Sequence, residues 1–107
     1  MSTYNPVTTR LLSFHDAVDD FISGKDTPRD YLERCIATIE DREPDVKAFV
    51  VMDLDAARAA ADASTARYKS GTPLSLIDGM PMGIKDLYDT ADLPTQMNSK
   101  LFEGLQP

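Results

Sequence analysis

The chain has 107 residues, enough for one small domain and too few for a second hydrophobic core. Its hydrophobic content of 42% is too high for an intrinsically disordered chain. Eleven Lys and Arg residues against eighteen Asp and Glu residues give a net charge of −7. Because no basic stripe is present to neutralise phosphates, we expect no direct binding to nucleic acid or to an anionic membrane.

The cysteine, histidine and apolar residues indicate where the protein acts and which kinds of site it lacks. The one cysteine, Cys35, cannot form an internal disulfide, which fits a reduced thiol in a cytoplasmic protein. We expect neither a signal peptide nor a membrane span, because the apolar runs are too short for either. His15 has no second His and no Cys nearby, so no metal site and no cofactor are expected.

The first predicted helix begins after Ser13, a natural N-cap, with Asp16 three residues later as in a capping box. Apolar side chains then follow the spacing of one helix face: Phe14, Ala17, Val18, Phe21 and Ile22. Gly24 is expected to end the helix, because glycine adopts the left-handed conformation without strain. Residues 1–9, before it, are expected to form a flexible arm.

The second predicted helix has Thr27 as its N-cap, Pro28 at its first position and Asp30 near the positive end of its dipole. Pro44 is expected to end it. One apolar face is predicted to be buried and consists of Tyr31, Leu32, Cys35, Ile36 and Ile39.

A β-prone run from Lys47 to Met52 predicts a strand, and a third helix is predicted from about residue 53 or 55 to Tyr68, before the breaker at 70–73. The predicted inward face of this helix is mostly small: Leu54, Ala57, Ala60, Ala61, Ser64 and Tyr68. Small side chains bury little area, so we expect this helix to need a large partner surface.

The last third of the chain contains more proline and glycine. A short apolar run, Met80 to Ile84, predicts a strand that enters a tight site, and residues 90–99 predict a structured loop. Lys85 and Asp86 directly follow the run. A lysine at the end of a buried segment can act as a general base, because burial disfavours the ammonium form. The ordinary alternative is a solvated surface charge, or a surface pair with Asp86.

A resemblance favours the first interpretation. The stretch from Asp78 reads Asp-Gly-Met-Pro-Met-Gly-Ile-Lys-Asp-Leu, and Leu93-Pro94-Thr95 follows after a short loop. This order closely resembles the first signature of the amidase signature family, and upstream segments such as Tyr31-Leu32 agree as well. The resemblance extends from about residue 10 to residue 107. It implies an α/β/α fold around a mixed sheet, with this chain as a single incomplete N-terminal domain over residues 1–107. The expected fold class is α/β, with three amphipathic helices and a few strands.

The same resemblance implies hydrolysis of carbon–nitrogen bonds by a Ser–cis-Ser–Lys triad. Lys85 matches the catalytic lysine, which would activate the nucleophilic serine through the bridging serine. Asn98-Ser99 stands where the family commonly has Gly-Ser; Asn tolerates a positive φ, and Ser99 is expected to be a loop hydroxyl rather than the nucleophile. The family's Gly- and Ser-rich segment is absent from these residues. We therefore expect a fragment that is inactive alone and self-associates through exposed apolar surface.

Three functions remain open from the sequence. The favoured one is hydrolysis of a small carboxamide by the complete enzyme. Within the family, the alternative is the A subunit of a tRNA-dependent amidotransferase, which releases ammonia from glutamine; residues 99–101 and 103–104 favour it, whereas 95–98 favour a general amidase. An alternative of another class is a non-catalytic helical interaction module.

Overall fold

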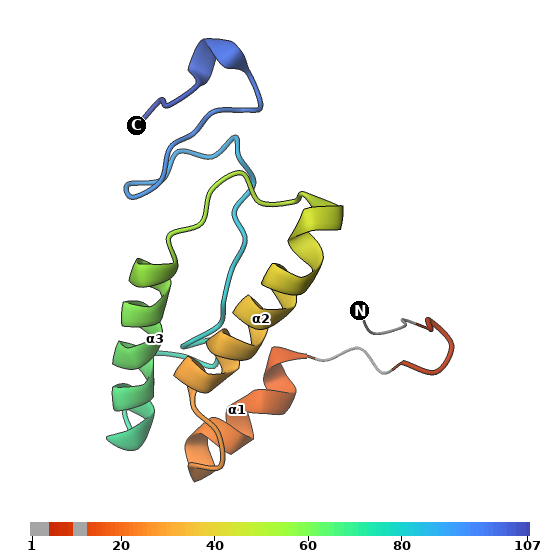
Figure 1. Cartoon of the computed structure of the whole chain (residues 1–107). Helices are drawn as coiled ribbons and strands as arrows, with labels where there is room; N and C mark the ends of the chain where they lie inside the picture. Colours follow the sequence, from red (N-terminus) through yellow and green to blue (C-terminus); the bar gives the residue numbers. More distant parts are fainter. Residues whose placement is uncertain (1–4, 10–12) are drawn as a thin grey trace.

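The fold is built on three helices, and its computed structural model describes residues 5–9 and 13–107 (Figure 1). In chain order they are α1 (Phe14–Ser23), α2 (Pro28–Val46) and α3 (Leu54–Lys69), followed by the short 3₁₀ helix η1 (Lys100–Phe102). Figure 1 shows the chain after α3 running back along α2 and α3 to the far end of these helices. The blue C-terminal segment lies there and carries η1 between stretches of irregular structure.

The helix ends follow the predicted caps. The Ser13 hydroxyl accepts a hydrogen bond from the His15 amide at 3.1 Å, and Gly24 ends α1 with φ +84°. The Thr27 hydroxyl accepts from the Asp30 amide at 3.1 Å, with Pro28 as the first residue of α2. These caps satisfy backbone groups that have no partner inside the helix.

The predicted end of α2 at Pro44 is wrong, because the helix continues to Val46. Proline lacks the backbone donor and its ring crowds the carbonyl four residues earlier, yet α2 continues for two residues beyond Pro44. Lys47 ends α2 in the left-handed conformation with φ 53°, and its amide donates to the Glu43 carbonyl at 2.8 Å.

The two predicted strands are not found among the residues that the structure describes. In the 47–52 segment, the amides of Ala48 and Phe49 donate to the Glu43 carboxylate instead of a neighbouring strand. The 80–84 segment is also irregular, with no strand paired beside it in the described parts of the chain. A strand requires a neighbour that completes its backbone hydrogen bonds. The mixed sheet is therefore not part of the described structure.

The arm predicted at residues 1–9 lies partly outside the described residues. Within the described part, residues 5–9 form a turn in which the Thr9 amide donates to the Asn5 carbonyl at 2.8 Å. None of the helices described is both long enough and apolar enough to cross a lipid bilayer.

An apolar strip holds α2 against α3. Leu32 and Ile36 of α2 are buried against Ala61 of α3, and Leu54 and Ala57 pack on them at the margin. The small side chain of Ala61 lets the two helices approach closely. The predicted burial of Ala60 is wrong, since it lies on the exposed side of α3. Of the expected buried face of α2, Tyr31, Cys35 and Ile39 are only half-buried.

An aromatic cluster attaches α1 to this pair of helices. Phe21 of α1 lies 5.4 Å from Tyr68 of α3 and 5.8 Å from Tyr31 of α2, measured between ring centroids. Phe14 contacts Tyr31 at 5.6 Å, and both contacts with Tyr31 are edge-to-face, a favourable arrangement of ring quadrupoles. The three helices thus meet around four aromatic rings.

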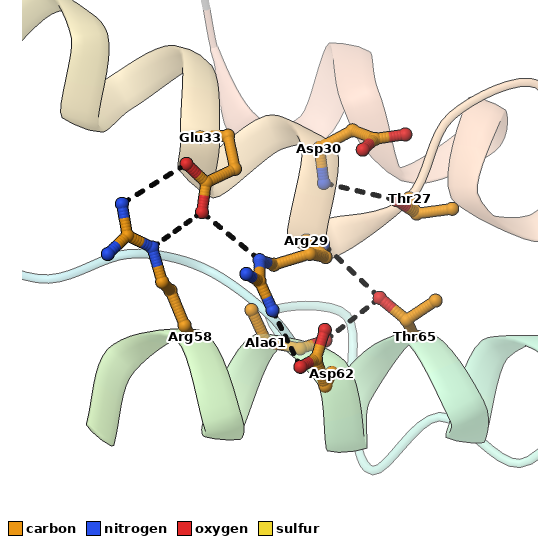
Figure 2. A network of polar contacts seen from close by, with 8 residues as sticks. All are labelled: Thr27, Arg29, Asp30, Glu33, Arg58, Ala61, Asp62 and Thr65. Carbon is orange, nitrogen blue, oxygen red and sulfur yellow. Dashed lines mark hydrogen bonds and ion pairs between the residues drawn. The ribbon is translucent and has the colours of Figure 1, made fainter. Parts of the chain in front are cut away.

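A polar network beside the apolar strip sets the register of α2 on α3 (Figure 2). The Glu33 carboxylate pairs with Arg29 on its own helix at 3.1 Å and with Arg58 on α3 at 2.7 Å. Arg29 also pairs with Asp62 at 2.6 Å. Hydrogen bonds from Arg58 and Arg29 lower the pKa of Glu33. Partly exposed pairs of this kind contribute little stability, so their main effect is alignment.

The fold exposes more surface than a compact domain of its size. Its accessible surface is 8061 Å², against about 5,900 Å² expected for a monomer of 11.8 kDa. Its radius of gyration is 16.1 Å, against about 13 Å for a compact chain of this length. Exposed apolar side chains are concentrated in 49–52 and after residue 73, including Met82, Ile84 and Leu87.

The buried strip can be tested with two matched substitutions in the 107-residue chain. Ile36 is 4% exposed, whereas Ile22 is 63% exposed. We expect Ile36→Ala to lower the free energy of unfolding by about 2–5 kcal/mol through loss of packing. Ile22→Ala should change it by less than about 0.5 kcal/mol. Urea unfolding followed by circular dichroism measures both. Equal effects of the two substitutions would show that the buried face of α2 is assigned wrongly.

Candidate functional site

The chain turns back after α3 around the buried carboxylate of Asp78, which is 7% exposed. Arg67 donates to it through Nε at 2.8 Å and Nη2 at 2.6 Å. The Ser64 hydroxyl donates at 2.9 Å and the Leu74 amide at 3.0 Å. The Tyr68 hydroxyl donates to the backbone carbonyl of Asp78 at 2.9 Å. We call these five residues the Asp78 anchor.

The Asp78 anchor is a charge-stabilised connection. The Arg67 guanidinium, with help from Leu74 and Ser64, holds the pKa of the Asp78 carboxyl well below its usual range. Hydrogen bonds to an ionised carboxylate are roughly twice as strong as those between neutral groups. The anchor therefore fixes the start of the 78–86 motif to the C-terminal half of α3.

Gly79 lets the motif approach the helices closely. Its φ of +89° lies in the left-handed region, which side chains rarely adopt. A Cβ atom at this position would lie 2.7 Å from the Ser64 hydroxyl and 2.9 Å from Cβ of Pro28. Both the backbone conformation and the space thus require glycine, and the motif is seated where α2 begins beside α3.

The motif leaves the helices before it reaches Lys85. Met80 and Pro81 are half-buried, whereas Met82, at 67% exposed, and the residues up to Lys85 lie at the surface. The prediction that Lys85 ends a buried segment is therefore wrong for the described structure. The physical reason is that the helices cover only the first part of this segment.

Of the ordinary alternative, the pair between Lys85 and Asp86 is not formed, whereas the exposure of Lys85 agrees with a solvated surface charge. Asp86 instead accepts a hydrogen bond through Oδ1 from the Gln96 amide at 2.8 Å. Within the described ranges, the Lys85 side chain makes no hydrogen bond and no ion pair. Its backbone carbonyl accepts from the amides of Leu87 at 2.8 Å and Tyr88 at 3.2 Å, so the chain turns directly after it.

In the loop after this turn, two predictions are confirmed, one for the backbone of Asn98 and one for the hydroxyl of Ser99. Asn98 has a φ of 50°, so asparagine does adopt the conformation expected where the family commonly has glycine. The Ser99 hydroxyl caps η1 by accepting from the Leu101 amide at 3.2 Å, which makes it a loop hydroxyl that satisfies the backbone. Met97 also has a positive φ, of 52°, which the sequence did not indicate.

The Asp78 anchor was not predicted from the sequence. Ser64 and Arg67 lie three residues apart on α3, which places them on one helix face, and this spacing was the available signal. In the parts of the chain that the structure describes, no three His, Cys, Asp or Glu side chains gather as metal ligands would.

Comparisons with known proteins bear on this site. The Amidase family model matches residues 30–107. The A subunit of the glutamyl-tRNA(Gln) amidotransferase of Myxococcus xanthus is 39% identical over 85 residues, which are 79% of this chain and 18% of that protein. The corresponding protein of Chloroflexus aggregans is 39% identical over 79% of this chain and 17% of its own. That of Rhodopirellula baltica is 35% identical over 91% of this chain and 19% of its own. The chain spans about a fifth of the length of these curated relatives, and no solved structure matches it significantly.

Two glycine substitutions distinguish the steric clash of an added Cβ atom from the cost of a positive φ. Gly71 has a φ of +70° with no atom near its would-be Cβ, whereas Gly79 has a similar φ and close neighbours. We expect Gly71→Ala to cost about 1–2 kcal/mol from the left-handed conformation alone. Gly79→Ala should cost about 2 kcal/mol more, because Ser64 and Pro28 must also move. Urea unfolding of both variants measures the difference. Equal costs would contradict the close approach at Gly79.

Proposed function

The chain belongs to the amidase family, and we propose that it carries the catalytic lysine, Lys85, of an enzyme that hydrolyses carboxamides. One observation carries the proposal: Lys85 follows the family's Gly-x-Pro motif, and its side chain is unpaired among the described residues although an aspartate is its neighbour. Because the amine takes part in no structural contact among the described residues, it is available for proton transfer.

In this proposal Lys85 is a general base. A neutral lysine accepts the proton of a bridging serine, which in turn deprotonates the serine that attacks the amide carbonyl. Both serines belong to the family's Gly- and Ser-rich segment, which these residues do not contain. We propose that the polypeptide that supplies them covers the apolar side chains of Met82, Ile84 and Leu87. Such cover would desolvate Lys85 and favour its neutral form.

The polypeptide proposed to cover these side chains would also explain why the predicted strands are not formed. We propose that residues 1–107 act as one incomplete domain, and that the β-prone segments 47–52 and 80–84 join a mixed sheet when the domain is complete. The exposure of 49–52, and of Met82 and Ile84 in the second segment, supports this, because these apolar side chains have no cover in the described structure. Alone, the chain is proposed to be inactive and to self-associate. The reduced thiol of Cys35 supports a cytoplasmic location.

A second candidate is favoured by the relatives. Those reported above are each named as the A subunit of a glutamyl-tRNA(Gln) amidotransferase, so glutamine is proposed as the amide, with ammonia as the product passed on. Both candidates use the same hydrolysis of a carbon–nitrogen bond and the same lysine. They differ in the substrate, a general small carboxamide in one case and glutamine in the other.

A chimaera tests the proposal, with this chain replacing the matching segment of the Myxococcus xanthus relative. We expect it to release ammonia from glutamine, because this chain would supply the lysine and the relative the remaining four-fifths of the protein. Lys85→Arg keeps the charge but cannot give up a proton near neutrality. Lys85→Arg and Lys85→Ala should each lower kcat by about 1,000-fold or more.

Lys69→Arg, an exposed lysine of α3, is the matched control and should leave kcat unchanged. Turnover by the Lys85→Arg chimaera equal to that of the parent would remove Lys85 from the catalytic role. A folded parent chimaera that releases no ammonia would equally contradict the proposal.

A further inference from the structure

We propose that Asp86 and Thr95 are positioning residues for Lys85, acting through a pair of hydrogen bonds that we call the 86/95 clamp. This inference rests on the proposed function. The clamp consists of the hydrogen bond from the Gln96 amide to Asp86 Oδ1 and the hydrogen bond from the Thr95 hydroxyl to the Tyr88 carbonyl. It joins the turn that follows Lys85 to a segment about ten residues further along the chain.

The two bonds of the clamp are complementary. In one, a side chain of the turn accepts from the backbone at 96, at 2.8 Å. In the other, a side chain at 95 donates to the backbone of the turn, at 3.0 Å. Both bonds run from donors at 95 and 96 to acceptors in the turn, one a side-chain oxygen and the other a backbone carbonyl, so they hold the two segments together at two points. The turn at 85–88 therefore has a defined place although Lys85 itself is exposed.

A third segment, residues 104–105, forms hydrogen bonds with both Thr95 and Gln96. Thr95 is 2% exposed, and its amide donates to the Leu105 carbonyl at 2.9 Å. The side-chain oxygen of Gln96 accepts from the Gly104 amide at 2.7 Å. Burial strengthens such bonds and makes loss of one partner costly. Thr95 is thus the central residue of the loop and not a surface threonine.

The clamp also has an electrostatic effect. A carboxylate that pairs with a lysine stabilises the ammonium form, which cannot act as a base. Here the Asp86 carboxylate is engaged by the Gln96 amide, and its second oxygen, Oδ2, is buried without a donor in the described parts of the chain. The Asp86 carboxylate thus bonds to the Gln96 amide and forms no ion pair with the Lys85 amine, while the clamp fixes the backbone that carries that amine.

Isosteric substitutions test the clamp in the chimaera. Thr95→Val keeps the shape of the side chain but removes the hydroxyl donor, whereas Thr95→Ser keeps the donor. We expect Thr95→Val to lower kcat for ammonia release by about 10–100-fold with KM within about twofold, because a small displacement of a catalytic group is costly. Thr95→Ser should retain most of the parent's kcat.

Asp86 provides the second pair of variants. Asp86→Asn keeps an oxygen that accepts from the Gln96 amide and should retain most of the turnover, whereas Asp86→Ala removes it and should match Thr95→Val. Ile36→Ala is the control for stability alone, since it lies in the helix core and should leave kcat unchanged below its melting temperature. If Thr95→Val does not fold, the comparison of Asp86→Ala with Asp86→Asn decides.

The outcomes separate the two proposals. If Lys85→Arg abolishes turnover while Thr95→Val or Asp86→Ala keeps the kcat of its conservative partner, the clamp does not position Lys85 and only this inference fails. If Lys85→Arg is as active as the parent, the proposed function itself fails. Loss of kcat in Ile36→Ala equal to that in Thr95→Val would assign the effect to stability and also overturn the inference.

Discussion

The structure depends on one buried carboxylate. Asp78 can be ionised inside the protein only because Arg67 and Ser64 of α3 donate to it. A buried charge without such partners would be strongly destabilising. Those donors are in place because the Leu32 and Ile36 strip holds α2 against α3, so that Pro28 and Ser64 form the surface on which Gly79 is seated. The helices therefore determine where the family motif begins.

The motif is fixed at both ends and open between them. The Asp78 anchor holds its start, and the 86/95 clamp holds the turn at its end. Met82 and Ile84, between the two, are exposed apolar residues. A segment fixed in this way leaves the Lys85 amine out of structural contacts, so that it is open to the polypeptide proposed to cover it. The large exposed surface and the proposed role of Lys85 are thus two consequences of the same arrangement.

Local features were predictable from the sequence, and long-range ones were not. The caps at Ser13 and Thr27, and the positive φ of Asn98, depend on residues within a few positions of each other. The Asp78 anchor joins residues up to 14 apart, so the spacing of Ser64 and Arg67 on α3 does not by itself identify Asp78 as their partner. The prediction of strands was wrong for a related reason. The β propensity of residues 47–52 is a local preference for extended backbone, but a strand also needs a neighbouring strand. The burial expected for Lys85 likewise depends on cover that the three helices do not provide.

The most direct test of this account is the pH dependence of the free energy of unfolding of the chain and of Asp78→Asn. The pKa of Asp78 is lowered in the folded state, so its contribution is complete above about pH 4, the ordinary value for an unfolded aspartate, and is lost as the pH falls toward the folded value. Asp26 and Glu33 have lowered pKa values too, but both remain in the variant. We predict a difference of about 3 kcal/mol near neutral pH that shrinks steadily below about pH 4. A difference that is absent, or constant down to about pH 2, would contradict the central place of Asp78.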